Sequence, residues 1–165
     1  LIEVTTPSPI DLALTKPRTN SPWAAVIASQ QKVKPHVMLV ITKGEAGGAQ
    51  SHVFALCEAL LAQVRFTVVI GGGDAPSWLG DQLKGLGIQV LALPALQETL
   101  LPWRVLPALQ GLVELIDTYA PDVVHAHSAM AGLVARMTRA QLDVQVLYTV
   151  HGFGFKPQVT AKGLY

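Results

Sequence analysis

From Val37 onward, the hydrophobic positions of the chain follow two alternating patterns. Short continuous apolar runs are typical of strands that are buried on both faces of a sheet. Between these runs, apolar residues recur at spacings of three and four, which is typical of helices that cover a sheet with one face. The predicted strands are residues 37–42, 66–70, 88–93, 121–127 and 144–150, and the predicted helices lie within about 53–64, 79–86, 102–119 and 130–137.

This alternation predicts an α/β fold with a parallel sheet, because each helix returns the chain to the start of the next strand by a right-handed crossover. We expect a Rossmann-like, doubly wound domain with helices on both faces and the strand order 3-2-1-4-5. In such a sheet, ligands bind beyond the carboxyl ends of the strands, where the strand order reverses. That crevice would lie between the loops at residues 44–48 and 125–128.

The first 35 residues have a different composition. They hold five of the eleven prolines and show no sustained apolar period. This composition favours a flexible arm over residues 1–35. A segment that packs along the domain or binds a partner is the alternative.

Composition excludes several classes of protein. Half of the 165 residues are hydrophobic and 14% are charged, which excludes a chain disordered throughout its length. No apolar stretch approaches the roughly 18 residues of a membrane-spanning helix, and no signal peptide opens the sequence, so we expect a cytoplasmic protein. The net charge of +1 without a basic run argues against a nucleic-acid partner. The single cysteine, Cys57, is expected in the core, because it belongs to an apolar helical stripe.

The glycine loop after the first strand is a candidate anion site. Gly47 and Gly48, followed by Gln50, open the next helix, so backbone N–H groups would face a phosphate without obstruction by side chains. The loop is not a Walker A motif, and Ala46 occupies the place of the second glycine of G-x-G-x-x-G. A glycine pair that merely permits a tight turn is the alternative.

A second candidate group lies at the ends of the fourth and fifth strands. His125 and His127 should share one face of their strand, because side chains alternate along it. We expect His125 beneath a helix in the core and His127 in the crevice beside Ser128, with His151 and Gly152 entering from the next loop. Two histidines without a third ligand, and the absence of any D-x-D sequence, imply no metal.

Trp103 and Arg104, beside Leu100 and Leu101, could touch a lipid or an interface. The alternative is that these side chains simply cap a buried helix.

Three segments together resemble the N-terminal half of a glycosyltransferase family 4 enzyme of the GT-B fold. They are VITKGEAGGAQ at 40–50 followed by His52 and Val53, PDVVHAHSAMAGLVAR at 121–136 and YTVHGFGF at 148–155. The resemblance extends over residues 36–157, with the motifs in the family's order and spacing. It implies a retaining, metal-independent hexosyltransferase without a cofactor. Such an enzyme moves a sugar from a nucleotide-diphosphate sugar to a glycan or lipid-linked acceptor in polysaccharide or lipopolysaccharide biosynthesis.

The resemblance also implies roles by position. His127 would be the catalytic residue and would face the transferred sugar and the acceptor, and the glycine pair would stand near the donor diphosphate. The residues implied in substrate binding are Gly47, Gly48, Gln50, Ser128, His151 and Gly152.

Elements of the family's second Rossmann-like domain, which supplies most nucleotide contacts and an E-x7-E element, do not occur in residues 1–165. We therefore expect residues 36–157 to form the acceptor-side domain of a fragment that is inactive alone. Residues 158–165 would begin the connection to a missing C-terminal domain, and peripheral contact with the inner face of a membrane is a further expectation. A non-catalytic Rossmann-like ligand-binding or interaction domain is the alternative. A nicotinamide dehydrogenase is disfavoured by the broken glycine pattern.

Overall fold

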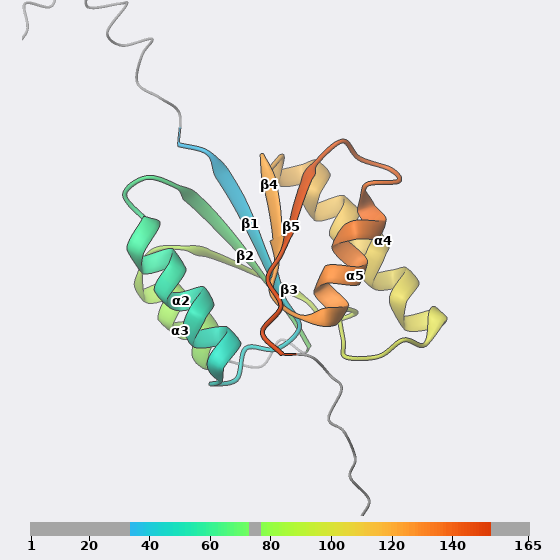
Figure 1. Ribbon diagram of the computed structural model, residues 1–165, viewed down its shortest axis with the longest axis horizontal. Helices are drawn as coiled ribbons and strands as arrows, with labels where there is room; N and C mark the ends of the chain where they lie inside the picture. The colour runs from blue at the N-terminus through green and yellow to red at the C-terminus, as the bar shows by residue number, and fades with distance from the viewer. Residues whose placement is uncertain (1–33, 73–76, 153–165) are drawn as a thin grey trace, which may run out of the picture. The chain divides into compact units, whose positions relative to one another are not determined.

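The computed structural model describes residues 34–72 and 77–152. Most of the expected N-terminal arm and the expected connection over residues 158–165 lie outside these residues. The described residues form an α/β domain with one sheet between two layers of helices (Figure 1).

All strand pairs of the sheet are parallel, and the order is β3-β2-β1-β4-β5. The predicted fold class and strand order are therefore confirmed. The central strand pairs on both sides, so that Leu39 lies opposite Val68 on one side and His125 on the other. The strands are β1 (His36–Ile41), β2 (Arg65–Gly71), β3 (Gln89–Leu93), β4 (Val123–Ala126) and β5 (Gln145–Tyr148).

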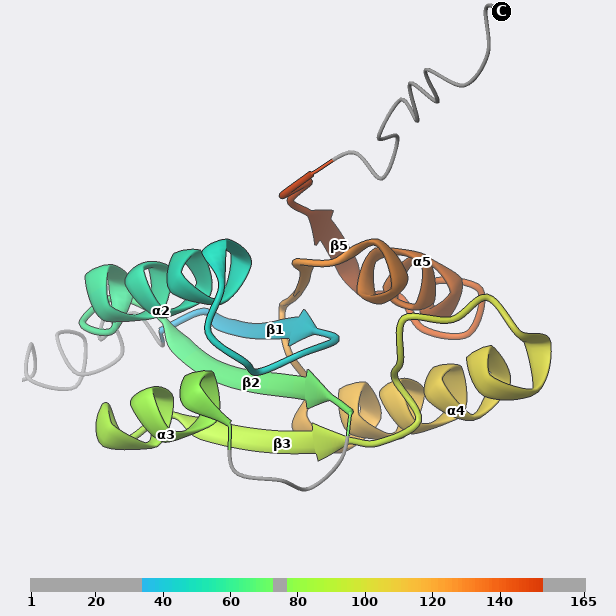
Figure 2. The same ribbon diagram turned by 90° about the horizontal axis from the view of Figure 1, so that it is seen from below.

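Two helices cover each face of the sheet, as Figure 2 shows. Alternate side chains of β1 enter the two layers of the core: Leu39 and Ile41 pack with the first helix pair, and Met38 and Val40 with the second. Burial on both faces explains the continuous apolar runs of the sequence. The first pair is α2 (Gly48–Leu60) and α3 (Trp78–Gly85), and the second is α4 (Pro102–Tyr119) and α5 (Ala129–Thr138).

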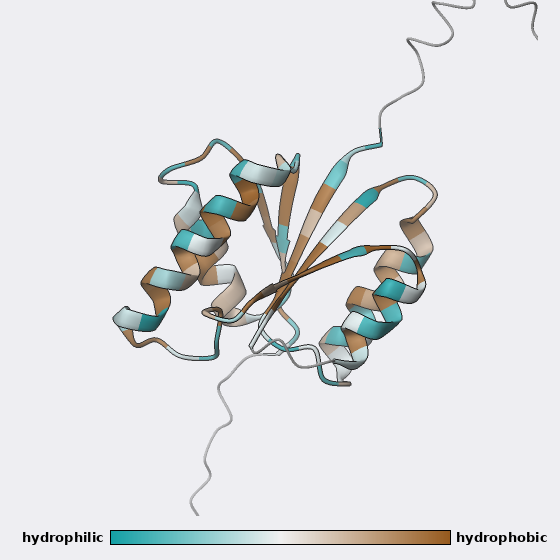
Figure 3. Ribbon diagram, turned by 180° about the vertical axis from the view of Figure 1, so that it is seen from behind, coloured by the Kyte–Doolittle hydropathy of each residue, from teal (hydrophilic) through white to brown (hydrophobic). Residues whose placement is uncertain are grey.

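Hydrophobic residues of the helices pack against the sheet, and the ribbon of the helices in Figure 3 is brown at such residues. Cys57 of α2 is completely buried, as expected, and burial raises the pKa of its thiol to about 12. Within residues 34–72 and 77–152, no helix combines the length and the apolar character that crossing a membrane requires.

Backbone hydrogen bonds continue past the carboxyl ends of the central strands. The N–H of His127 donates to Val40 O (2.9 Å), and the N–H of Thr149 donates to Ala126 O (3.0 Å). The loops that follow β4 and β5 are therefore fixed to the sheet at this edge, which brings the residues after both strands side by side.

Candidate functional site

A crevice of about 170 Å³ opens at the carboxyl edge of the sheet, beside β1, β4 and β5. The loop after β1, the first turn of α2 and the loop before α5 form its walls. The structure brings five of the predicted site residues to these walls: Gln50, His127, Ser128, His151 and Gly152. This is the reversal point of the strand order, where the sequence placed the site.

Gly47 and Gly48 stand at the start of α2 but do not line the crevice. A Cβ at Gly48 would meet nothing within 4 Å, so the space above the helix N-terminus is open. Gln50 folds back over the loop, and its Nε2 donates to Lys43 O at 3.0 Å. In the same loop, position 44 requires a glycine, because a Cβ there would collide with the side chain of Ser77.

Two helix N-termini border the crevice. α2 begins at Gly48, and α5 begins at Ala129 after Ser128, whose Oγ accepts a hydrogen bond from the N–H of Ala131 at 3.3 Å. Neither helix carries an acidic residue in its first turn. Free N–H groups and the helix dipoles give this edge a positive potential, which suits an anionic ligand such as a phosphate.

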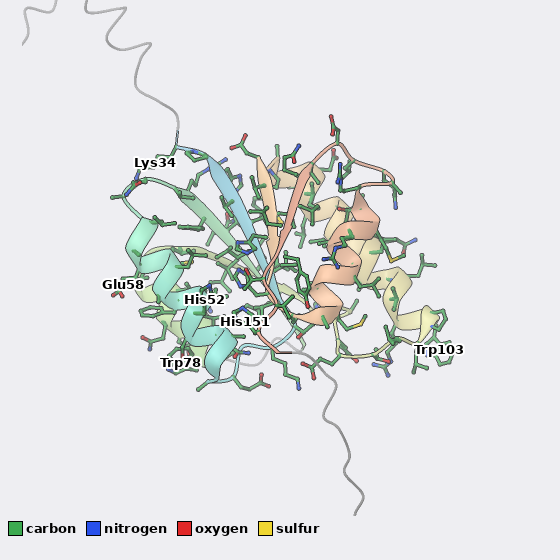
Figure 4. The ribbon with its side chains drawn as sticks, viewed as in Figure 1. Lys34, His52, Glu58, Trp78, Trp103 and His151 are labelled. Atoms are coloured by element: carbon green, nitrogen blue, oxygen red, sulfur yellow. The ribbon has the colours of Figure 1, made fainter. Side chains whose placement is uncertain are left out.

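Four histidines, from α2, from β4 and its end, and from the loop after β5, meet beside the crevice. His127 Nδ1 lies 3.0 Å from His151 Nε2. The ring of His52, from α2, has its centroid 5.7 Å from that of His127 and 5.1 Å from that of His151. The ring of His125 lies 4.1 Å from that of His127. Figure 4 shows His52 and His151 close together near the centre of the molecule.

The expected placement of His125 in the core was wrong. His125 is half-buried, and its Nε2 lies 2.8 Å from Thr149 Oγ1, whereas His127 is only 1% exposed. β4 and β5 lie at one end of the sheet, outside the cover of α2 and α3, which leaves His125 partly open. His127 lies beyond the strand end, and His52 and His151 cover it while it still lines the crevice.

Burial lowers the pKa of His125, His127 and His151. Desolvation, reinforced by the neighbouring histidines, lowers the pKa of His127 to about 3. The pKa values of His125 and His151 are lowered for the same reason. His127 is therefore neutral at physiological pH. Its Nε2 is buried without a hydrogen-bond partner, which leaves an unsatisfied polar atom at the crevice.

Sequence reasoning assigned no role to three polar residues beside the crevice, although His52 and Lys43 belong to the first motif. His52 lies one turn into α2, and its ring lies against the ring of His127. Lys43 and Glu98 form an ion pair of 2.7 Å at the crevice, and Glu98 raises the pKa of Lys43 by hydrogen bonding and by its charge. No sequence signal connects two residues so far apart in the chain. Among the described residues, no group of three or more histidine, cysteine or carboxylate side chains is arranged to hold a metal ion.

The depressed pKa of His127 predicts that acid destabilises the domain. The unfolded chain, with an ordinary histidine pKa near 6.5, binds more protons than the folded chain between about pH 3 and 6.5. The free energy of unfolding should thus fall as the pH is lowered through this window. His127→Gln should flatten that slope by up to about 1.4 kcal/mol per pH unit. Urea unfolding between pH 7 and 4 measures both slopes.

Cys57→Ser is the matched control for this experiment, because it perturbs the core without removing a group that titrates in the same window. It should lower stability at every pH and leave the slope unchanged. Parallel slopes for the wild type and His127→Gln would contradict the depressed pKa.

The fold and the site define a class: a Rossmann-like α/β domain in which helix N-termini and histidines border a crevice at the carboxyl edge of the sheet. The chain matches the glycosyl transferase 4-like domain over residues 47–165, and it belongs to that family. The family resemblance seen in the motifs is thereby confirmed.

Similar proteins agree with this assignment. EpsD of Bacillus subtilis (strain 168), named as a glycosyltransferase, is 45% identical over 47 residues, which cover 27% of this chain and 12% of EpsD. A glycosyltransferase of Rickettsia africae ESF-5 superimposes with a TM-score of 0.58 at 18% identity, over 76% of this chain and 32% of that one. Anabaena Alr3699/HepE, in complex with UDP and glucose, gives a TM-score of 0.55 at 15% identity, over 72% and 30%. The solved structures share the fold, and this chain spans about a third or less of each relative.

Proposed function

We propose that this chain is the acceptor-side domain of a retaining glycosyltransferase that moves a hexosyl group from a nucleotide-diphosphate sugar to a glycan or lipid-linked acceptor. Membership of the glycosyl transferase 4-like family supports sugar transfer. The observation that carries the proposal is the crevice itself, where two helix N-termini and the neutral, partly unsatisfied His127 converge.

The helix N-termini suit the leaving group of such a reaction. Negative charge develops on the nucleotide diphosphate as the bond to the sugar breaks, and fixed N–H donors stabilise it without reorganising. The open space above Gly48 would allow the diphosphate to approach the backbone of α2 closely, with Gly47 at its N-cap. We therefore propose a reaction that needs neither a metal ion nor a cofactor. HepE, crystallised with UDP and with UDP-glucose, supports a nucleotide-sugar donor.

His127 suits a hydrogen-bonding role toward the transferred sugar. A pKa of about 3 prevents the imidazole from serving as a proton donor at neutral pH. Its Nδ1 is engaged by His151 at 3.0 Å, which fixes the ring and leaves Nε2 for a sugar hydroxyl. Gln50, Ser128 and Gly152 would complete the substrate contacts from the crevice walls.

The remaining proposals concern the whole protein. Because this chain spans about a third or less of its relatives, we propose that most donor contacts lie outside it and that it is inactive alone. We also propose a cytoplasmic protein, peripheral at the inner face of the membrane, that acts in polysaccharide or lipopolysaccharide biosynthesis.

Calorimetry and a transfer assay test this function together. UDP-glucose titrated into the 165-residue chain should bind weakly or not at all. The full-length protein, given a panel of nucleotide sugars and acceptors, should transfer sugar at the same rate with and without EDTA. NMR of the product should show the anomeric configuration of the donor.

Each result can contradict a separate part of the proposal. Tight donor binding by the chain would refute the placement of the donor contacts, and loss of activity in EDTA would refute metal independence. An inverted product would refute the retaining mechanism. Ligand binding without any transfer by the full-length protein would favour the non-catalytic alternative.

A further inference from the structure

The polar crevice is lined by a lysine and a carboxylate that bind each other. Among the described residues that line it, Lys43 and Glu98 are the only charged side chains apart from histidine. Lys43 Nζ lies 2.7 Å from Glu98 Oε2, and each side chain is 54% exposed. The buried Thr42 adds a weak hydrogen bond, since its Oγ1 donates to Glu98 Oε1 at 3.5 Å. The positive charge of Lys43 is therefore neutralised by the chain itself.

The two partners belong to segments that reach the crevice separately. Lys43 lies in the loop after β1 and Glu98 lies between β3 and α4, and Figure 2 shows both segments leaving the sheet at its carboxyl edge. Gln50 Nε2 donates to Lys43 O at 3.0 Å. The N–H of Leu79 donates to the next carbonyl, Gly44 O, at 2.9 Å, so the backbone of the loop is held in place. A change of partner by Lys43 thus requires movement of its exposed side chain alone.

The other walls of the crevice favour an anion as the partner of Lys43. The N-termini of α2 and α5 border it without an acidic residue in either first turn. His127 is 1% exposed, and its Nε2 lacks a hydrogen-bond partner within the chain. The volume of about 170 Å³ lies below the roughly 300–1,000 Å³ of a typical small-molecule site, so the crevice suits one group of a larger ligand. A phosphoryl group combines small size, negative charge and several acceptor oxygens.

The ion pair between Lys43 and Glu98 is easily exchanged. Exposed pairs contribute little to stability, because water screens both charges and two flexible side chains must be ordered. A phosphoryl group offers charge-assisted hydrogen bonds to the lysine and to helix N–H groups at the same time. Glu98, and to a smaller extent Glu45 in the same loop, raises the pKa of Lys43. The ordinary pKa of lysine is already far above neutral, so Lys43 stays cationic when it leaves Glu98.

We propose that Lys43 binds a phosphoryl group of the substrate in the crevice, and that Glu98 is a positioning residue that holds Lys43 until the phosphoryl group displaces it. The inference rests on the proposed function and adds to it a binding residue and the counter-ion of that residue. With substrate bound, Lys43 and the two helix N-termini share the phosphoryl oxygens. The phosphoryl group belongs to the donor diphosphate or to a phosphorylated acceptor, and kinetics separates these two sources.

Binding of inorganic pyrophosphate to the 165-residue chain, followed by NMR titration at constant ionic strength, tests the exchange. Lys43→Met should weaken binding at least about fivefold, because the ligand loses its cationic partner. Glu98→Gln should strengthen binding at least about threefold, because Lys43 then has no internal ion pair to break. This gain should be smaller in a chain that also carries Lys43→Met, which has no lysine to release. Both side chains are half-exposed, so the substitutions should leave the fold intact.

Lys84→Met and Glu114→Gln are the matched controls. Lys84 on α3 and Glu114 on α4 are exposed and lie outside the crevice, and their substitutions change the net charge by the same amounts. Both controls should bind pyrophosphate within about twofold of the wild type, because salt screens distant surface charges.

Three results of the titration would overturn the proposal. The first is the absence of pyrophosphate binding by the wild type, and the second is unchanged affinity in Lys43→Met. The third is a Glu98→Gln variant that binds no more tightly than the wild type, or whose gain is equal with and without Lys43. An equal gain would mean that Glu98 acts through its charge alone and does not hold Lys43.

Kinetics of the full-length protein identifies the source of the phosphoryl group. Lys43→Met should raise KM for either the nucleotide sugar or a phosphorylated acceptor, and the affected substrate is the one that Lys43 binds. Unchanged KM values for both substrates would overturn the inference.

Failure of this inference and failure of the proposed function give different results. If pyrophosphate binding responds to both substitutions as expected but the full-length protein transfers no sugar, the proposed function is wrong and the phosphoryl site stands. If sugar is transferred but both variants bind pyrophosphate as the wild type does, the inference is wrong and the proposed function stands.

Discussion

Replacing His127 with alanine is expected to lower kcat/KM for sugar transfer by the full-length protein by about 100-fold. A preorganised polar group that faces the reacting sugar contributes on this order when it is removed from a water-poor site. His127 is buried, neutral and held by His151, and its Nε2 has no partner of its own, so a substrate hydroxyl would satisfy it. Steady-state kinetics at a pH where both proteins are folded measures the effect.

His36→Gln separates a catalytic effect from general damage to the fold. His36 is a buried histidine at the opposite, amino end of β1, and its Nε2 lies 2.9 Å from Thr67 Oγ1. Burial lowers its pKa as well. This control should reduce stability but leave kcat/KM within about twofold of the wild type. A His127→Ala protein that keeps more than half of the wild-type kcat/KM would contradict the role of His127.

Replacing Gly71 with alanine is expected to lower the free energy of unfolding by about 3 kcal/mol. Gly71 ends β2, and a Cβ there would collide with Leu96 O and lie 2.8 Å from Thr42 O. Both obstacles are backbone atoms, so no side-chain rotation can relieve the clash. Urea unfolding, monitored by circular dichroism, should show an earlier midpoint with an unchanged slope.

Gly85→Ala is the matched control for this prediction. Gly85 ends α3, and a Cβ there would meet nothing within 4 Å. Alanine is favoured over glycine in a helix, so the variant should be more stable by about 0.5–1 kcal/mol. If Gly71→Ala unfolded at the same urea concentration as Gly85→Ala, the tight packing at the end of β2 would be refuted.

The packing at Gly71 also affects the site. Gly72, the next residue, donates its N–H to Leu96 O at 3.0 Å, which holds the segment after β3 against the end of β2. Glu98 follows in that segment, pairs with Lys43 and lines the crevice. We therefore expect Gly71→Ala to disturb the crevice mouth in addition to lowering stability.

The strands and helices were predictable because their burial is periodic. Residues 37–42 form a continuous apolar run because β1 is covered on both faces, and the structure places the strand at 36–41. The start of α2 was predicted less accurately, since the apolar stripe begins at Val53 whereas the helix begins at Gly48. The first turn is largely open toward the crevice, so it leaves no hydrophobic period in the sequence.

The candidate site was predictable only in part. Gln50, His127, Ser128, His151 and Gly152 follow strands or open helices at the carboxyl edge, so topology alone brings them to the crevice. The roles of these residues, and those of Gly47 and Gly48, stay predictions. The ion pair between Lys43 and Glu98 depends on the path of the segment after β3 over the ends of the strands. No local sequence pattern encodes that path.

By itself, the sequence determined the parallel sheet, the strand order expected for it and the edge where the crevice lies, because hydrophobic periodicity reports which face of each element is buried. Only the tertiary structure decided that His127 is buried and His125 half-open, and that His52 joins them. The physical reason is that burial, and the pKa that follows from it, depends on how far distant elements extend over a side chain.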